Sequence, residues 1–330
     1  MQTTVQALLA AMPPSSTQHI SLPVYNDAPL DLTLVRGARG GQTLVVSAGV
    51  HGCEYIGVEA LRRLRSALDP AQLSGNVVLL PLANPEGFYA QAKQVVPADQ
   101  VNLNRAFPGD AAGSAAYRRA YAIERYLFSA ADFWLDLHSG DMHEMVMPYA
   151  YFPLAGAAPE TPADQPRVTP ETALKACSAV KALSVSYRLG SYARTGLYNW
   201  AALRGIPSLL LERSGRCLRP EEDIAIYMRQ VGELMAHLGI AEPTGASAAT
   251  PQQELTDAIY TEAQQPGFWY PYIKEGQTFA AGACLGRLED LSGNCVQQVR
   301  AAFDGLVLYY TAVLGVAEGD GLVAYARLAH

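Results

Sequence analysis

The sequence has little of what several classes of protein require. Its 330 residues include 24 Lys and Arg against 31 Asp and Glu, which gives a net charge of −7. The basic residues are scattered, so the chain offers no basic patch for nucleic acid or an acidic membrane surface. No apolar run approaches the ~20 residues of a membrane span, and the N-terminus lacks the features of a signal peptide. We therefore expect neither a nucleic-acid partner nor a membrane partner.

Cysteine and histidine are also scarce. The five cysteines are dispersed and form no CxxC pair, a pattern typical of reduced thiols in a cytoplasmic protein. Half of the residues are apolar and only 17% are charged, which excludes a disordered chain. The six histidines are thus the polar residues to locate first.

The length predicts roughly two domains at ~150 residues each. Over residues 1–243, apolar β-branched runs alternate with helical periodicity, which predicts an α/β domain with a mixed, mostly parallel sheet flanked by helices. Strands are expected at 42–50, 76–84 and 133–137, and helices at 56–68 and 115–130, as the sequence pattern indicates. The proline-rich stretch 153–170 is expected to be a loop.

The chain changes character after residue 243. Residues 241–253 are small and polar and predict a linker. Residues 254–330 contain short β-type runs separated by glycines, so we expect 244–330 to form a small all-β domain.

Polar residues stand at or just past the ends of the three strands predicted above and of a fourth predicted strand, the apolar run GIPSLLL. They are His51, Asn84, His138 and Glu212. Because ligands bind beyond the carboxyl ends of parallel strands, these side chains are expected to lie around one crevice.

His51, Glu54 and His138 are candidate metal ligands. Imidazole nitrogen and carboxylate oxygen are both zinc ligands, and two His with one Glu leave a fourth position open, as in catalytic sites. His143 competes with His138 for the third place. We favour His138 because it directly follows the apolar run FWLDL.

Glu212 is a candidate general base. It follows the apolar run GIPSLLL, and a glutamate at an apolar strand end tends to have a raised pKa, which suits proton transfer to and from a metal-activated water. The alternative is a structural ion pair with Arg213 or Arg216.

Asn104 and Arg105 place an amide beside a guanidinium. Arginine recognises carboxylates through two parallel hydrogen bonds, so this pair is a candidate for binding an anionic substrate group. The alternative is an ordinary loop arginine.

Four segments together resemble a known family. They are GVHGCEYIG, NP followed by NLNRAFPG, DLHSGD and LLLERSG. In this order they resemble the succinylglutamate desuccinylase/aspartoacylase family of the zinc carboxypeptidase superfamily, over residues 40–240 or so. The resemblance implies a zinc-carboxypeptidase-like fold and one Zn²⁺ per chain. It also implies zinc ligation by His51, Glu54 and His138, base catalysis by Glu212, and carboxylate binding by Asn104 and Arg105.

One position departs from the family pattern. The family suggests an arginine that helps to polarise the scissile carbonyl about ten residues before Asn104, where this chain has Gln94, with Lys93 beside it. Lys93 is a candidate replacement with a different reach. Arg194 and Tyr198, together with Tyr192, are further candidates for lining the substrate pocket.

The C-terminal segment carries a second resemblance. Residues 267–288 and 301–310 are similar to the two halves of a biotinyl/lipoyl barrel-sandwich hybrid. Carrier domains of that type have a lysine on the hairpin between the halves, and the corresponding stretch 289–297 has none. We therefore expect a cap or assembly element without a prosthetic group, from which Tyr270 and Tyr272 could approach the cleft.

These observations predict a zinc-dependent amidohydrolase that removes the acyl group from an N-acyl amino acid or a related small carboxylate. A zinc carboxypeptidase-like peptidase would share the same machinery and is the first alternative. A non-catalytic protein that binds metal or carboxylate is the second. A cytoplasmic location is expected, and a homo-oligomer is compatible with the sequence.

Overall fold

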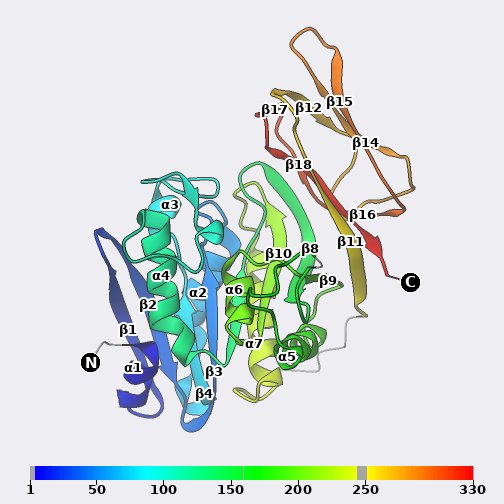
Figure 1. The fold of residues 1–330 in the computed structure, drawn as a ribbon. Coiled ribbons are helices and arrows are strands. Elements are labelled where there is room, and N and C mark those ends of the chain that lie inside the picture. Colours follow the sequence, from blue (N-terminus) through cyan, green and yellow to red (C-terminus); the bar gives the residue numbers. More distant parts are fainter. Residues whose placement is uncertain (1–3, 159, 244–250, 330) are drawn as a thin grey trace.

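A mixed twelve-stranded sheet forms the centre of the molecule in the computed structural model, which describes residues 4–158, 160–243 and 251–329 (Figure 1). The strand order is β1-β2-β4-β3-β7-β10-β8-β9-β11-β18-β16-β13. The strands up to β10 that belong to this sheet are β1 (Ser16–Val24), β2 (Asp27–Arg36), β3 (Arg39–Ala48), β4 (Ser74–Leu80), β7 (Phe133–Leu137), β8 (Glu144–Pro153), β9 (Tyr187–Ser191) and β10 (Ser208–Gly215).

The sheet is mixed, as expected, and its parallel pairs lie in the central group of strands and again at β8–β9 and β9–β11. Parallel pairs join β4, β3, β7 and β10 in succession. Antiparallel pairs flank this group on both sides, at β2–β4 and at β10–β8. The shift to antiparallel pairing beyond β10 matters for the site, because β8 approaches the crevice from the opposite direction to β7.

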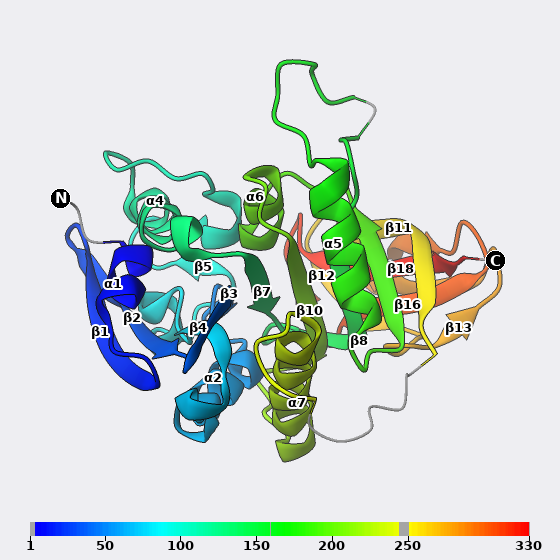
Figure 2. The same ribbon diagram turned by 90° about the horizontal axis from the view of Figure 1, so that it is seen from below.

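Helices cover both faces of the sheet, as Figure 2 shows for α2 and α7 on one side and α1, α4 and α6 on the other. The helices are α1 (Val5–Ala11), α2 (Tyr55–Ala67), α3 (Pro85–Tyr89), α4 (Ala115–Leu127), α5 (Pro170–Lys181), α6 (Leu197–Leu203) and α7 (Glu221–His237). None of the helices in the described residues is long and apolar enough to cross a membrane.

Alternation along β3 divides the apolar side chains between two cores. Leu44, Val46 and Ala48 pack with α2, α5 and α7, whereas Val45 packs with α1, α4 and α6. A strand buried on both faces reads as an unbroken apolar run, which is why 42–50 was recognisable in the sequence. The predicted helices 56–68 and 115–130 correspond to α2 and to α4 with the 3₁₀ turn that follows it.

The C-terminal residues form strands throughout the range 251–329. They are β11 (Gln253–Glu262), β12 (Gly267–Pro271), β13 (Thr278–Phe279), β14 (Cys284–Glu289), β15 (Cys295–Arg300), β16 (Gly305–Thr311), β17 (Gly315–Val316) and β18 (Gly321–Leu328). Four of them make a second sheet, ordered β15-β14-β12-β17. The hairpin at 289–297 is the β14–β15 connection.

This all-β part continues the main sheet. β11 pairs in parallel with β9, and β16 pairs with the start of β8. The predicted linker 241–253 covers residues 244–250, which lie outside the described residues. A domain division between residues 243 and 244 therefore stays a prediction. The β11–β9 and β16–β8 pairings show that strands before and after this point share one sheet.

Within the predicted loop 153–170, the described residues 154–158 and 160–169 lie between β8 and α5 and project from the body of the molecule (Figure 2).

Candidate active site

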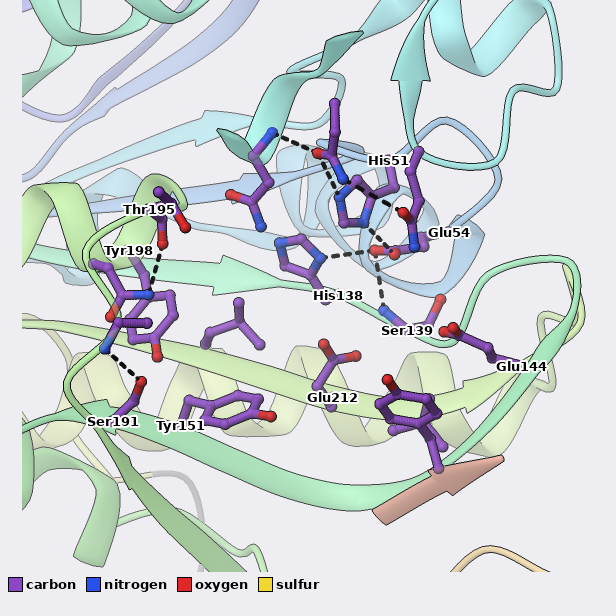
Figure 3. A pocket seen from close by; sticks show the side chains of 18 of the residues that line it. His51, Glu54, His138, Ser139, Glu144, Tyr151, Ser191, Thr195, Tyr198 and Glu212 are labelled. Atoms are coloured by element: carbon purple, nitrogen blue, oxygen red, sulfur yellow. Dashed lines mark hydrogen bonds and ion pairs between the residues drawn. The ribbon is translucent and has the colours of Figure 1, made fainter. Parts of the chain in front are cut away.

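A cavity of about 430 Å³ lies where β3 and β7 end and β8 and β10 pass each other. His51, Glu54 and His138 line one side of it, and Glu212 faces them (Figure 3). Asn104, Arg105, Gln94 and Tyr198 also line it. Most of the residues predicted from the sequence thus come together at one place.

His51, Glu54 and His138 form a compact group of three buried side chains. One ligand atom from each lies within 4.8 Å of the others. His51 Nδ1 is 2.6 Å from Glu54 Oε1, and His138 Nδ1 is 2.9 Å from Glu54 Oε2. The three potential ligand groups therefore converge on one point, as a bound divalent ion requires.

The second nitrogen of each imidazole has a partner that fixes the ring. His138 Nε2 lies 3.1 Å from Asp136 Oδ2, and Asp136 in turn accepts a hydrogen bond from Ser47. His51 Nε2 lies 3.3 Å from the side-chain oxygen of Asn102. Each ring can donate from Nε2 and leave the Nδ1 lone pair for a metal, which is the usual arrangement of ligating histidines. The sequence did not indicate these two supporting residues.

The charge of Glu54 also suits a metal ligand. Burial acts to raise the pKa of this carboxyl, but the adjacent rings of His51 and His138 hold it at about 2. Glu54 is thus an anion at neutral pH. Two imidazoles and one carboxylate, all oriented toward one point, fit a catalytic zinc ion.

Glu212 lies inside β10 rather than after it. The parallel pairing of β10 with β7 ends at Leu211–Leu137, so Glu212 is the first residue of β10 beyond the end of β7. Its Oε2 atom is buried with no hydrogen-bond partner among the described residues. Burial raises the pKa of Glu212 well above its ordinary value, an effect that His138 opposes and Glu54 reinforces. Arg213 pairs with Asp223 at 2.8 Å, not with Glu212.

Asn104 and Arg105 belong to the 3₁₀ turn Leu103–Arg105. The side-chain oxygen of Asn104 accepts a hydrogen bond of 2.8 Å from the backbone N–H of Leu197, at the start of α6. This bond fixes Asn104, whereas the Arg105 guanidinium remains exposed at the wall of the cavity. Arg105 is the one Arg or Lys among the described residues that line the cavity.

Residues 40–163 match the succinylglutamate desuccinylase/aspartoacylase catalytic domain. This segment holds all three candidate metal ligands.

Similar proteins extend the match to nearly the whole chain. The chain is 27% identical over 323 residues to an N-alpha-acetyl-L-2,4-diaminobutyric acid deacetylase from Halomonas elongata, covering 94% of this chain and 90% of the relative. An aspartoacylase family protein from Mesorhizobium loti is 26% identical, with a TM-score of 0.77 and coverage of 97% and 96%. The ectoine utilization protein EutE (DoeB) from Ruegeria pomeroyi, 23% identical, shares the fold with a TM-score of 0.81 and coverage of 96% and 98%.

Gln94, which stands where the pattern of the desuccinylase/aspartoacylase family suggests an arginine, lies at the cavity. Gln94 lines it and donates to Asp141 Oδ2 at 3.3 Å. Lys93 does not line it; its ammonium group lies 3.5 Å from Asp141 and 3.7 Å from Asp320. Among the described residues, no lysine lines the cavity at the place where the family pattern suggests an arginine.

The remaining candidates from the sequence differ in whether they line the cavity. Tyr198 is buried in the cavity wall, whereas Arg194 is outside the cavity and donates to the carbonyl of Pro166 at 2.6 Å. His143 is not among the converging ligand atoms. Asn84 caps α3 by accepting from Gly87 N–H and does not line the cavity.

The opposite wall contains residues that the sequence did not reveal. They are Glu144, Tyr149, Tyr151, Tyr260 and Tyr309. Tyr149 and Tyr151 are two apart on β8 and could have been assigned to one face of a strand. Tyr260 and Tyr309 come from β11 and β16. Tyr270 and Tyr272, the two tyrosines expected to approach the cleft, do not line the cavity. No local pattern marks Tyr260 and Tyr309, since they reach the site only through the pairing of distant strands.

Proposed function

We propose that this protein is a zinc-dependent deacylase that hydrolyses the amide bond of an N-acyl amino acid. The observation that carries the proposal is the convergence of His51, Glu54 and His138 on one point of a cavity, with the Glu212 carboxyl facing them. The names of the relatives, a deacetylase among them, support an amide as the bond that is cleaved.

His51, Glu54 and His138 would hold the metal. A bound zinc ion would lower the pKa of water and polarise the scissile carbonyl. Glu212 would take a proton from the attacking water and return it to the nitrogen of the leaving amine. Its raised pKa suits both steps, because a carboxyl that binds protons more tightly is the better base. Arg105 would hold the substrate carboxylate with its guanidinium, beside Asn104.

The size of the cavity favours a small substrate over a polypeptide. A volume of about 430 Å³ falls within the ~300–1,000 Å³ of small-molecule sites. A zinc carboxypeptidase-like peptidase would need space for a longer chain. The deacylase proposal therefore stands first, and short peptides serve as the comparison.

Metal removal and a single substitution test the proposal. The protein is stripped with a chelator, reloaded with zinc, and assayed with N-acetyl and N-succinyl amino acids, Nα-acetyl-L-2,4-diaminobutyric acid and short peptides. We expect activity on an N-acyl amino acid that disappears with the metal and returns with zinc. The Glu212→Gln variant is expected to retain zinc and lose a factor of about 10²–10⁴ in kcat.

Three outcomes would contradict the proposal. Full turnover by the stripped protein would exclude the metal, and an active Glu212→Gln variant would exclude Glu212 as the base. No hydrolysis of any substrate by the zinc-loaded protein would favour a non-catalytic binding role. An exposed glutamate on α7 provides a matched control variant, Glu222→Gln.

A further inference from the structure

A second cavity adjoins the catalytic cavity where two strands of the main sheet separate. The parallel pairing of β9 with β11 ends at Leu189 and Leu255. Just beyond this point the register of β11 against β18 is interrupted between Thr256 and Ile259, and Asp257 has a φ of 51°. An irregularity of this kind bends a strand away from its neighbour. The gap between β9 and β11 holds a cavity of about 400 Å³.

The two cavities have part of their walls in common. Tyr151, Ser191 and Tyr260 line both of them. The hydroxyl groups of Tyr151 and Tyr260 are 2.6 Å apart, so the two hydrogen-bonded rings separate one cavity from the other. Tyr260 is half exposed, and an exposed side chain changes its rotamer readily. The partition between the cavities is therefore one hydrogen bond with a movable ring on one side.

The lining of the second cavity suits an uncharged group. Its aliphatic side chains are Leu154, Leu189, Leu255 and Ala258. The two acids that line it are paired with cations of their own, Glu254 with Arg188 at 2.8 Å and Asp257 with Arg327 at 3.1 Å. An apolar chain that enters this cavity would leave water without removing the partner of a charged group.

The shared wall lies at the end of the catalytic cavity where Arg105 is found. Asn104, next to Arg105, accepts from the backbone N–H of Leu197, in the segment 191–197 that begins with Ser191. Ser191 lies at one end of the catalytic cavity and Glu144 at the other (Figure 3). In an N-acyl amino acid the carboxylate and the side chain are attached to the same carbon, whereas the acyl group lies across the scissile bond. A carboxylate at Arg105 therefore places the side chain beside the second cavity.

We propose that the second cavity binds a long apolar side chain on the amino acid portion of the substrate, and that the Tyr151–Tyr260 partition opens to admit it. The substrate class is then an N-acyl amino acid with an extended aliphatic side chain. This inference rests on the proposed function and specifies the part of the substrate that the second cavity receives.

The test compares two series of substrates on the zinc-loaded enzyme. The first consists of the N-acetyl derivatives of alanine, norvaline, norleucine and 2-aminooctanoic acid. We expect kcat/KM to rise along this series, by up to about fourfold for each methylene group that leaves water. The second series lengthens the acyl group on alanine instead, and we expect no such rise.

Two variants alter the second cavity and the partition. Ala258→Leu fills the cavity, so it should abolish the gain for long side chains and leave N-acetylalanine unchanged. Ala67→Leu, at the exposed end of α2, is the matched control. Tyr260→Phe breaks the hydrogen bond to Tyr151 and keeps the ring, so it should raise kcat/KM for the longest side chain by up to about fivefold.

Calorimetry of free 2-aminooctanoic acid and free alanine with the zinc-loaded protein gives a readout independent of turnover. We expect the longer amino acid to bind more tightly and Ala258→Leu to remove the difference. Equal kcat/KM along the side-chain series, a rise along the acyl series, or an unchanged gain in Ala258→Leu would overturn the inference and leave the deacylase function intact. Hydrolysis of no substrate in either series would count against the proposed function, and the calorimetric comparison would still decide whether the second cavity binds the side chain.

Discussion

The two walls of the cavity are built in different ways. On the metal side, each imidazole is held by a further residue, and the His138–Asp136–Ser47 chain ends at the buried Trp134 indole N–H, which donates to Ser47 at 2.8 Å. On the facing side, the hydroxyl of Tyr151 contacts the hydroxyls of Tyr149 and Tyr260. The Glu144 carboxyl has no hydrogen-bond or ion-pair partner in the described residues. The side chains of the first wall are thus held by one another, whereas burial and the nearby Asp141 carboxyl raise the pKa of Glu144 in the second wall to about 8.

The largest effect is expected at the metal ligands. His138→Ala removes one of three converging ligand groups, so the variant should lose both zinc and activity. His143→Ala, five residues along the same segment, should retain both. Metal content after dialysis and turnover measure the difference. If His143→Ala lost the metal and His138→Ala kept it, the assignment of the metal wall would be wrong.

Substitutions of Asp136 and Asn102, which hold the two imidazole rings, should lower the zinc affinity to different extents. Asp136→Asn weakens the hold on His138 and is expected to reduce zinc affinity by about 10–100-fold. Asn102→Ala should cost less, because its contact with His51 is 3.3 Å long and neutral. Competition with a metal-sensitive dye measures both affinities. Equal zinc affinity in the wild type and Asp136→Asn would show that the metal wall does not depend on these contacts.

Arg105 tests the recognition of the substrate carboxylate. Arg105→Lys keeps the charge but loses the planar pair of donors, so KM should rise about tenfold while kcat changes less. Arg194→Lys is the matched control, since Arg194 lies outside the cavity and bonds to Pro166. Steady-state kinetics compare the two. A rise in KM only for Arg194→Lys would place the carboxylate elsewhere.

The smallest effect concerns stability and pH. The pKa of Glu144 is about 8 in the folded protein, against an ordinary value of 4.5. Between these values the folded state binds a proton that the unfolded chain has released, so the free energy of unfolding falls as the pH rises from about 5 to 8. The contribution of one such group is at most about 1.4 kcal/mol per pH unit.

Glu144→Gln should therefore reduce this pH dependence, and Glu222→Gln should not. Urea unfolding of the metal-free variants at several pH values measures the slope. The same slope in Glu144→Gln and the wild type would mean that the facing wall does not retain the proton as described.

The metal wall could be predicted from the sequence because its residues follow recognisable strands. His51 and His138 come directly after apolar runs that could only be buried, and Glu54 stands three residues beyond His51. Their convergence follows from the shared edge of parallel strands. The sequence did not indicate the supporting residues Asp136 and Asn102, because Asp136 lies inside β7 and Asn102 lies in the two-residue strand Val101–Asn102, whose position depends on its pairing with Val95–Val96.

The sequence by itself determined the α/β class, the all-β C-terminal part and the candidate metal ligands, since these depend on local periodicity and short spacing. The tertiary structure alone decided that β11 and β16 join the main sheet and bring Tyr260 and Tyr309 to the cavity. It also decided that Lys93 forms its ion pair with Asp141. Pairing between strands that are 66 and 163 residues apart leaves no local pattern, because the contacts form only when the whole sheet assembles.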